Sequence, residues 1–137
     1  MIEHLSFSVT GQGLHSITSV VSQSIARRFR GQDGLCTLFI QHTSASLLIQ
    51  ENYDDSARID LERWLNRLVP ENDPLYTHTL EGPDDMPAHI KAALTASSVA
   101  IPIINGQLAL GSWQGIYLWE HRHAASERNL VMHLSNS

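Results

Sequence analysis

The dipeptide Asn105-Gly106 stands between two runs of strand-forming residues and gives the clearest local signal in the chain. Asn-Gly between residues 99–104 and 107–110 is the pattern of a β-hairpin closed by a type I′ turn. Residues 115–121 and 129–134 follow as two further strand-like segments. The last third of the chain is therefore expected to be a series of antiparallel strands.

Two to three helices are expected in the rest of the chain. Apolar residues recur at helical spacing over residues 19–30. A second helix is capped by Asn52 or Asp54 and runs to about Leu68, because one stripe of the helix is apolar. A third helix is expected to start near residues 84–85, where acidic side chains favour a helix N-terminus.

Residues 2–9, 35–40 and 45–49 also read as strands, and Gly11-Gln12-Gly13 reads as a turn. Strands and helices segregate along the chain instead of alternating, which favours an α+β fold over a doubly wound parallel sheet. No repeat, low-complexity stretch or linker interrupts the sequence. Residues 1–137 are therefore expected to form a single domain.

Composition excludes several classes of protein. The formal net charge of -5 argues against a general nucleic-acid binder, which normally presents a basic face to phosphates. No apolar run approaches the roughly 20 residues that cross a bilayer, so no membrane association is expected. The single cysteine, Cys36, rules out an intramolecular disulfide and indicates a cytoplasmic protein. Cys36 lies in an apolar strand and is interpreted as packing.

Three histidines are the best metal-ligand candidates. His42 belongs to a polar group, His42-Thr43-Ser44, that interrupts two strand-like runs. His78 and His89 lie in a stretch punctuated by proline and glycine that also holds three acidic residues. Neutral imidazole suits zinc and related ions, and three histidines would leave an open position, as in catalytic sites. The spacing is not diagnostic, so hydrogen-bonded core or surface histidines are the alternative.

Acids and hydroxyls near these histidines are further candidates. Glu120 lies beside titratable and cationic neighbours and is either a general acid or base or half of a structural ion pair. Asp85 is either a catalyst or a helix cap. The hydroxyls of Thr43, Ser44 and Ser46 either orient phosphate oxygens or satisfy the backbone at a bend. No glycine-rich nucleotide-binding motif is present.

Three separated motifs carry a resemblance to a known family. They are His42-Thr43-Ser44-Ala45-Ser46 followed by Gln50-Glu51-Asn52, the block Glu81-Gly82-Pro83-Asp84-Asp85-Met86-Pro87-Ala88-His89-Ile90, and Leu110-Gly111-Ser112-Trp113-Gln114 leading to Glu120. With these motifs the chain resembles, from about residue 7 to residue 134, the YjbQ-like family, whose members are known as secondary thiamine-phosphate synthases.

The resemblance implies a folded antiparallel sheet, in the form of a sandwich or half-barrel, and a homotrimer with pockets near the subunit interfaces. It also implies that one pocket is lined by the His42 block together with His78, Asp85, His89, Gln114 and Glu120. Members of the family usually continue after this glutamate with an Asp-Gly-Pro-Arg type of stretch. This chain instead reads His121-Arg122-His123, so no role for Arg122 carries over.

The implied reaction joins a pyrimidine carried on a diphosphate leaving group to a thiazole phosphate. The leading hypothesis is therefore a metal-assisted enzyme acting on a small phosphorylated metabolite, with thiamine-phosphate synthesis as its primary or a secondary reaction. A divalent ion, Zn or Mg, would be held by His42, His78 and His89, and loss of His89 should abolish turnover.

In this hypothesis Glu120 or Asp85 acts as general acid or base, while Thr43, Ser44 and Gln114 orient the substrate. The dedicated synthases are (β/α)8 barrels of roughly 250 residues, which 137 residues cannot form. Two alternatives stay open: a metal-dependent hydrolase, and a trimeric metabolite-binding protein without catalysis.

Overall fold

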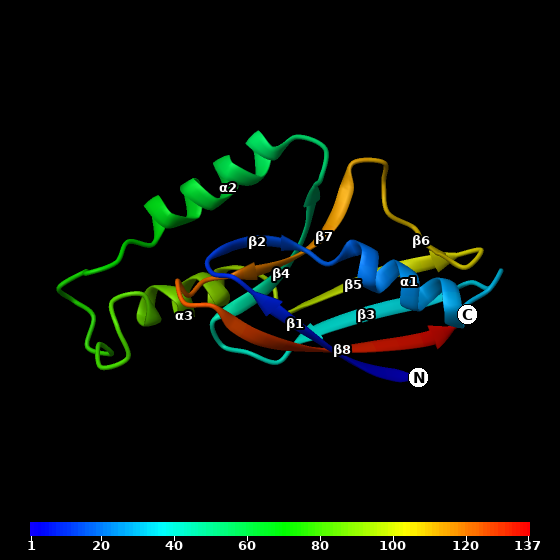
Figure 1. The fold of residues 1–137 in the computed structure, drawn as a ribbon, viewed down its shortest axis with the longest axis horizontal. Coiled ribbons are helices and arrows are strands. Elements are labelled where there is room, and N and C mark those ends of the chain that lie inside the picture. The colour runs from blue at the N-terminus through cyan, green and yellow to red at the C-terminus, as the bar shows by residue number, and fades with distance from the viewer.

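The computed structural model describes residues 1–137, which form eight strands and three helices (Figure 1). In chain order the elements are β1 (Ile2–Val9), β2 (Gly13–Ser16), α1 (Thr18–Arg28), β3 (Gly34–Ile40), β4 (Ala45–Glu51), α2 (Asp55–Leu68), α3 (Asp85–Leu94), β5 (Ser98–Ile104), β6 (Gln107–Leu108), β7 (Gln114–Glu120) and β8 (Ser126–Asn136). The expected α+β class is confirmed.

The strands form two antiparallel sheets with the main core between them. One sheet has five strands in the order β1-β8-β3-β5-β6, and the other has three in the order β2-β7-β4. A cluster of 17 buried residues joins both sheets to α1. This is the expected folded antiparallel arrangement, and its helices number three.

The turn at Asn105-Gly106 has the expected type I′ character. Both residues have positive φ angles, 51° at Asn105 and 75° at Gly106, as the two central positions of that turn require. A side chain at Gly106 would also approach the Phe29 carbonyl oxygen to 2.6 Å. The second strand of the hairpin, β6, is two residues long and is therefore shorter than the sequence pattern indicates.

One strand lies where the sequence indicates only a turn. The bend at Gly11 and Gln12 leads directly into β2, whose first residue, Gly13, pairs with Glu120 of β7. The backbone N–H of Leu14 donates to Glu62 Oε2 at 2.7 Å, which ties β2 to α2. A four-residue strand shows too little alternation to be recognised from sequence, and its partners define it.

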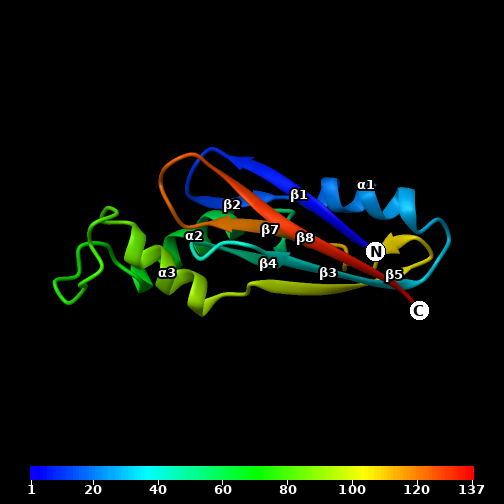
Figure 2. The same cartoon turned by 90° about the horizontal axis from the view of Figure 1, so that it is seen from below.

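The outer face of the three-stranded sheet is covered by α2 and α3. Leu65 of α2 and Val69 pack against Leu14, Tyr117 and Trp119 in a second buried cluster. Figures 1 and 2 show α3 and the loop before it at one end of the molecule and both chain termini at the other end. None of the helices has the length and apolar character needed to span a membrane.

A buried ion pair closes the main core at the α3 end. Glu120, the last residue of β7, is fully buried, and Arg128 of β8 is 6% exposed. Arg128 Nε donates to Glu120 Oε1 at 2.5 Å, and Arg128 Nη2 donates to Oε2 at 2.8 Å. The two residues belong to different sheets, so this bidentate contact fixes one sheet to the other.

Removing one partner of this pair should destabilise the fold severely. We expect Arg128→Ala to lower the free energy of unfolding by about 3–5 kcal/mol, because it leaves the Glu120 carboxylate buried without a cation. The double variant Glu120→Gln/Arg128→Met should recover much of that loss. Urea denaturation measures both.

The control is Arg27→Ala, which removes an exposed cation on α1 and should change the free energy of unfolding by no more than about 0.5 kcal/mol. Equal losses in the Arg128 and Arg27 variants would contradict a stabilising role for the buried pair.

Candidate functional site

Two histidines converge on one buried carboxylate at the start of α3. Asp85 and His89 lie four residues apart and therefore share a face of α3, while His78 comes from the preceding loop. His78 Nε2 lies 2.6 Å and His89 Nε2 lies 3.1 Å from Asp85 Oδ2. One ligand atom from each of the three residues lies within 4.8 Å of the others, a spacing that can hold a metal ion.

The orientation of His89 is set by the bend between β3 and β4. His89 Nδ1 lies 3.1 Å from the Thr43 carbonyl oxygen, which only accepts hydrogen bonds, so the network assigns the proton to Nδ1. Ser44 Oγ lies 3.5 Å from the same nitrogen. In the neutral ring Nε2 then carries a lone pair directed at Asp85. That contact is favourable only with a proton or another cation between the two atoms.

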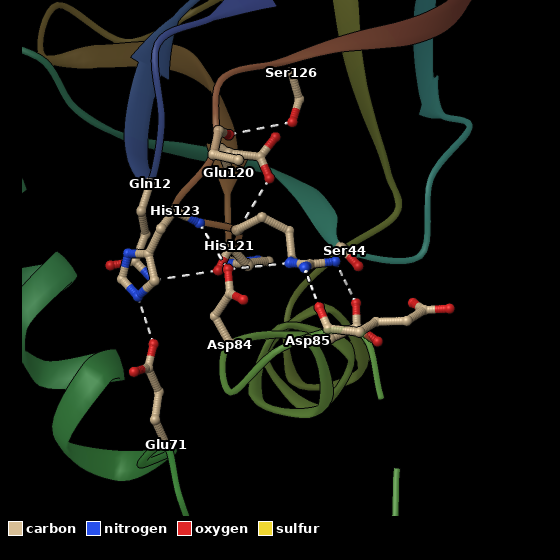
Figure 3. Close-up of polar contacts among 12 residues, drawn as sticks. Gln12, Ser44, Glu71, Asp84, Asp85, Glu120, His121, His123 and Ser126 are labelled. Atoms are coloured by element: carbon tan, nitrogen blue, oxygen red, sulfur yellow. Dashed lines mark hydrogen bonds and ion pairs between the residues drawn. The ribbon is translucent and has the colours of Figure 1, made fainter. Parts of the chain in front are cut away.

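Arg122 holds the other oxygen of Asp85. Its Nη1 donates to Asp85 Oδ1 at 2.5 Å, its Nε donates to Asp84 Oδ2 at 3.1 Å, and its Nη2 donates to the Glu81 carbonyl oxygen at 2.9 Å (Figure 3). Burial of Asp85 opposes its ionisation, but the His78 hydrogen bond and the charges of His89 and Arg122 outweigh burial and lower the pKa of Asp85. The carboxylate is therefore kept ionised.

His42 lies next to this cluster but its nitrogens are engaged elsewhere. Its Nδ1 accepts the Ser44 backbone N–H at 3.0 Å, and its Nε2 lies 2.7 Å from Arg128 Nη1. Partial burial and the positive charge of Arg128 lower the pKa of His42, which keeps the ring neutral. Of the three histidines expected to share a metal, the structure thus brings two together, and Asp85 takes the place of His42.

Glu120 has both carboxylate oxygens occupied. Besides the two bonds from Arg128, its Oε2 accepts the backbone N–H of Arg122 at 3.0 Å. Of the two roles that the sequence left open for Glu120, the structural ion pair is the one that this geometry supports.

Ser46 and Gln114 lie away from the cluster within one chain. Ser46 Oγ is 2.9 Å from His121 Nε2 on the buried side of the small sheet that faces the helices. Gln114 begins β7 and therefore lies at the opposite end of the strand from Glu120, where its Oε1 accepts the Gly111 N–H at 2.7 Å. A single subunit does not bring Gln114 to the histidines.

A cavity of about 330 Å³ opens beside His78. Its walls come from the loop before α3 and the first turn of that helix, and include Tyr76, His78, Thr79 and Met86. This volume lies at the lower end of the range for small-molecule sites. The arrangement therefore combines a His-Asp-His cluster, a fixed carboxylate and an adjoining space for a small ligand.

Sequence reasoning missed two buried polar residues of this region. His121 is 1% exposed, and burial with the charges of Lys91 and Arg128 lowers its pKa to about 3. Lys91 of α3 is 3% exposed, and its Nζ donates to Asn66 Oδ1 at 2.5 Å. A signal for Lys91 was present, because it is the only lysine in the chain. For His121 the signal was the alternation Tyr117, Trp119, His121, which continues one face of the strand.

The fold and this cluster define an α+β protein of two facing antiparallel sheets that carries a His-Asp-His site at one end. The description "UPF0047 protein YjbQ-like" belongs to the family model that matches residues 3–137. The chain therefore belongs to the YjbQ-like UPF0047 family, as its three motifs indicated.

Curated relatives agree over nearly the full length. The UPF0047 protein sll1880 of Synechocystis sp. is 47% identical over 133 residues, which cover 97% of this chain and 90% of the relative. The UPF0047 protein YjbQ of Escherichia coli O157:H7 is 41% identical over 127 residues, which cover 93% of this chain and 91% of the relative.

A solved structure shares the fold. The chain superposes with a TM-score of 0.87 and 32% identity on an uncharacterised YjbQ/UPF0047 protein of Clostridium acetobutylicum, with 97% of this chain and 99% of that chain covered. Family and fold follow from these similarities.

The buried His121 should make stability depend on pH. Below about pH 6.5 a histidine of the unfolded chain takes up a proton, whereas folded His121 stays neutral down to about pH 3. The unfolded state then binds more protons, so stability falls as pH decreases through this window, by at most about 1.4 kcal/mol per pH unit. Urea denaturation from pH 7 to pH 5 should show a shallower decline for His121→Gln than for the wild type.

The matched control is His133→Gln, which removes an imidazole from the exposed side of β8. Identical pH slopes for the wild type and His121→Gln would contradict the assignment of a neutral buried ring.

Proposed function

We propose that this protein is a metal-assisted enzyme that acts on a small phosphorylated metabolite, with a divalent cation held by His78, Asp85 and His89. The observation that carries the proposal is the direction of His89 Nε2. Its ring donates through Nδ1 to a backbone carbonyl, as metal-binding histidines commonly do, and points its other nitrogen at a buried carboxylate.

The donor set fits a catalytic rather than a structural site. Two imidazoles and one carboxylate are typical zinc ligands that leave a further position open. Magnesium prefers oxygen ligands, so this set favours zinc or a similar ion. A cation bound here would stabilise negative charge on phosphate oxygens of the substrate or leaving group.

The protein's own groups would supply orientation and charge. Arg122 holds Asp85 through the oxygen that faces away from the histidines, so the carboxylate keeps its direction when substrate binds. The cavity beside His78 is lined by Thr79 and by Tyr76, whose hydroxyl donates to the Pro70 carbonyl oxygen at 3.0 Å. Glu120, enclosed by Arg128, would act by positioning the chain around Arg122 and not by proton transfer.

The candidate reaction is the condensation that forms thiamine phosphate, in which a thiazole nitrogen displaces diphosphate from the pyrimidine carrier. A metal-dependent hydrolase would instead release phosphate without a condensation product, and a binding protein would form neither. Product analysis after incubation with both substrates separates the three.

We further propose a homotrimer in which Gln114 of one subunit completes the pocket of a neighbour. Two observations support it. Gln114 lies at the far end of β7 from the cluster in its own chain. In addition, no helix covers the outer face of the five-stranded sheet, where Leu35, Phe39 and Ile104 are exposed by 39%, 49% and 60%. Exposed apolar side chains on an uncovered sheet face favour an interface between proteins.

Metal content tests the cluster directly. Tag-free wild-type protein should contain about one divalent ion per chain by elemental analysis, and His78→Ala, His89→Ala and Asp85→Asn should lose it together with turnover. His42→Gln should retain the metal, because its nitrogens face Ser44 and Arg128. His133→Ala controls for loss of an exposed histidine. Wild-type protein that is metal-free and cannot be reloaded would refute the proposal.

Subunit mixing tests the shared pocket. His89→Ala and Gln114→Ala should each be inactive as homo-oligomers. If His89 and Gln114 of each pocket come from different subunits, random co-assembly of the two variants should restore about a quarter of wild-type turnover. Light scattering should give the mass of three chains. Trimers that stay inactive after mixing would place both residues in the pocket of one chain.

A further inference from the structure

The only lysine of the chain is buried without a counter-ion. The other eight basic side chains are arginines, and most of these lie on the surface or in ion pairs. Lys91 is 3% exposed, yet no carboxylate oxygen lies within the 4.0 Å of a salt bridge. Asn66 Oδ1 is the one acceptor of its three N–H donors. Burial of an ammonium group costs desolvation free energy, which a counter-ion and hydrogen bonds to all three N–H groups can offset. Lys91 has no counter-ion and one hydrogen bond, so most of this cost is not offset.

The acidic groups nearest to Lys91 already have partners. Glu71 binds the His123 ring, and Asp84 accepts bonds from the Arg122 side chain and the His123 backbone (Figure 3). Glu62 accepts the Leu14 N–H and pairs with Arg58. Glu71 and Asp84 attract Lys91 from a distance, but none of the three carboxylates binds it.

Two open cavities meet at Lys91. They measure about 300 and 320 Å³ and share Gln12, Asn66 and Lys91 as lining residues. Arg63 lines the first cavity and His123 lines the second. Lys91, Arg63 and the Gln12 and Asn66 amides therefore line this space, and the two carboxylates that also line it, Glu62 and Glu71, already bind other groups.

This space is distinct from the His78-Asp85-His89 cluster. His89 and Lys91 are two residues apart on α3, so their side chains leave the helix about 200° from each other. Figure 3 agrees, because Gln12, His123 and Glu71 lie on one side of Asp84, and Asp85 with Ser44 lies on the other.

We propose that the space at Lys91 is a second binding site, which takes a small molecule through a phosphate or carboxylate group. The oxyanion binds the Lys91 ammonium group and is flanked by the Arg63 guanidinium and the side-chain amides of Gln12 and Asn66. The two free N–H donors of Lys91 then gain acceptors, and the buried charge gains its counter-ion.

Because Lys91 is the only lysine, its side-chain NMR signal can be observed without overlap from other lysines. With ¹³C-labelled lysine the protein should show one side-chain ε-CH₂ signal, and inorganic phosphate at constant ionic strength should shift it saturably, with half-saturation below about 10 mM. Acetate in place of phosphate distinguishes a carboxylate ligand from a phosphate ligand. Chloride, matched in ionic strength, should leave the signal in place.

Calorimetry on variants completes the test. Lys91→Met should weaken binding of the preferred anion by at least about tenfold, and Arg63→Gln should weaken it less. Arg67 lies on α2, as Arg63 does, but is exposed and lines neither cavity. Arg67→Gln should therefore leave binding unchanged. His78→Ala should also bind as the wild type does, which separates this site from the metal proposal. No saturable shift, a shift with chloride alone, or equal binding by Lys91→Met would overturn the inference.

Discussion

The buried contact between Glu120 and Arg128 is the constraint on which the α3 end of the molecule depends. It joins the last residue of β7 to β8 and so fixes the three-stranded sheet against the five-stranded sheet. Glu120 also accepts the backbone N–H of Arg122, which sets the path of the chain as it leaves β7. From there Arg122 reaches Asp84 and Asp85 at the start of α3. A buried ion pair is weak evidence for stability. Here the pair fixes the position of Glu120, Glu120 fixes the backbone of Arg122, and Arg122 fixes the direction of the Asp85 carboxylate.

Side chains alternate along β7, so neighbouring residues at the end of this strand face opposite sides of the three-stranded sheet. Glu120 faces the main core, while His121 faces the opposite side and meets Ser46 beneath the helices. Beyond the strand, Arg122 binds Asp85 and His123 binds Glu71. Arg122 binds Asp84, Asp85 and the Glu81 carbonyl oxygen, so it ties the chain that leaves β7 to α3 and the loop before it.

The sequence predicted most of the architecture because its signals are local. Asn105-Gly106 requires positive φ angles that few other dipeptides tolerate, and the apolar stripe of α2 and the acidic start of α3 are contained in single segments. The strand β2 was missed because it is defined by pairing with β7 and not by its own residues. The candidate site was predicted in part. His78, Asp85 and His89 meet, whereas His42 faces Arg128, a residue 86 positions away that no local pattern could link to it. The polar interruption at His42-Thr43-Ser44 acts on His89 mainly through the Thr43 backbone carbonyl, and side-chain chemistry alone does not reveal such a role.

The helix α3 connects the two proposed sites. It begins at Asp85, turns once to His89 on the face of the cluster, and presents Lys91 on the opposite face. The choice of lysine at that position follows from the surroundings. A guanidinium carries five donors in a planar fork suited to a carboxylate, whereas a compact ammonium can rest on the single oxygen of Asn66 and still direct two donors elsewhere. Asp85, His89 and Lys91 therefore share one short helix, and Arg122 holds the first turn of that helix through Asp85.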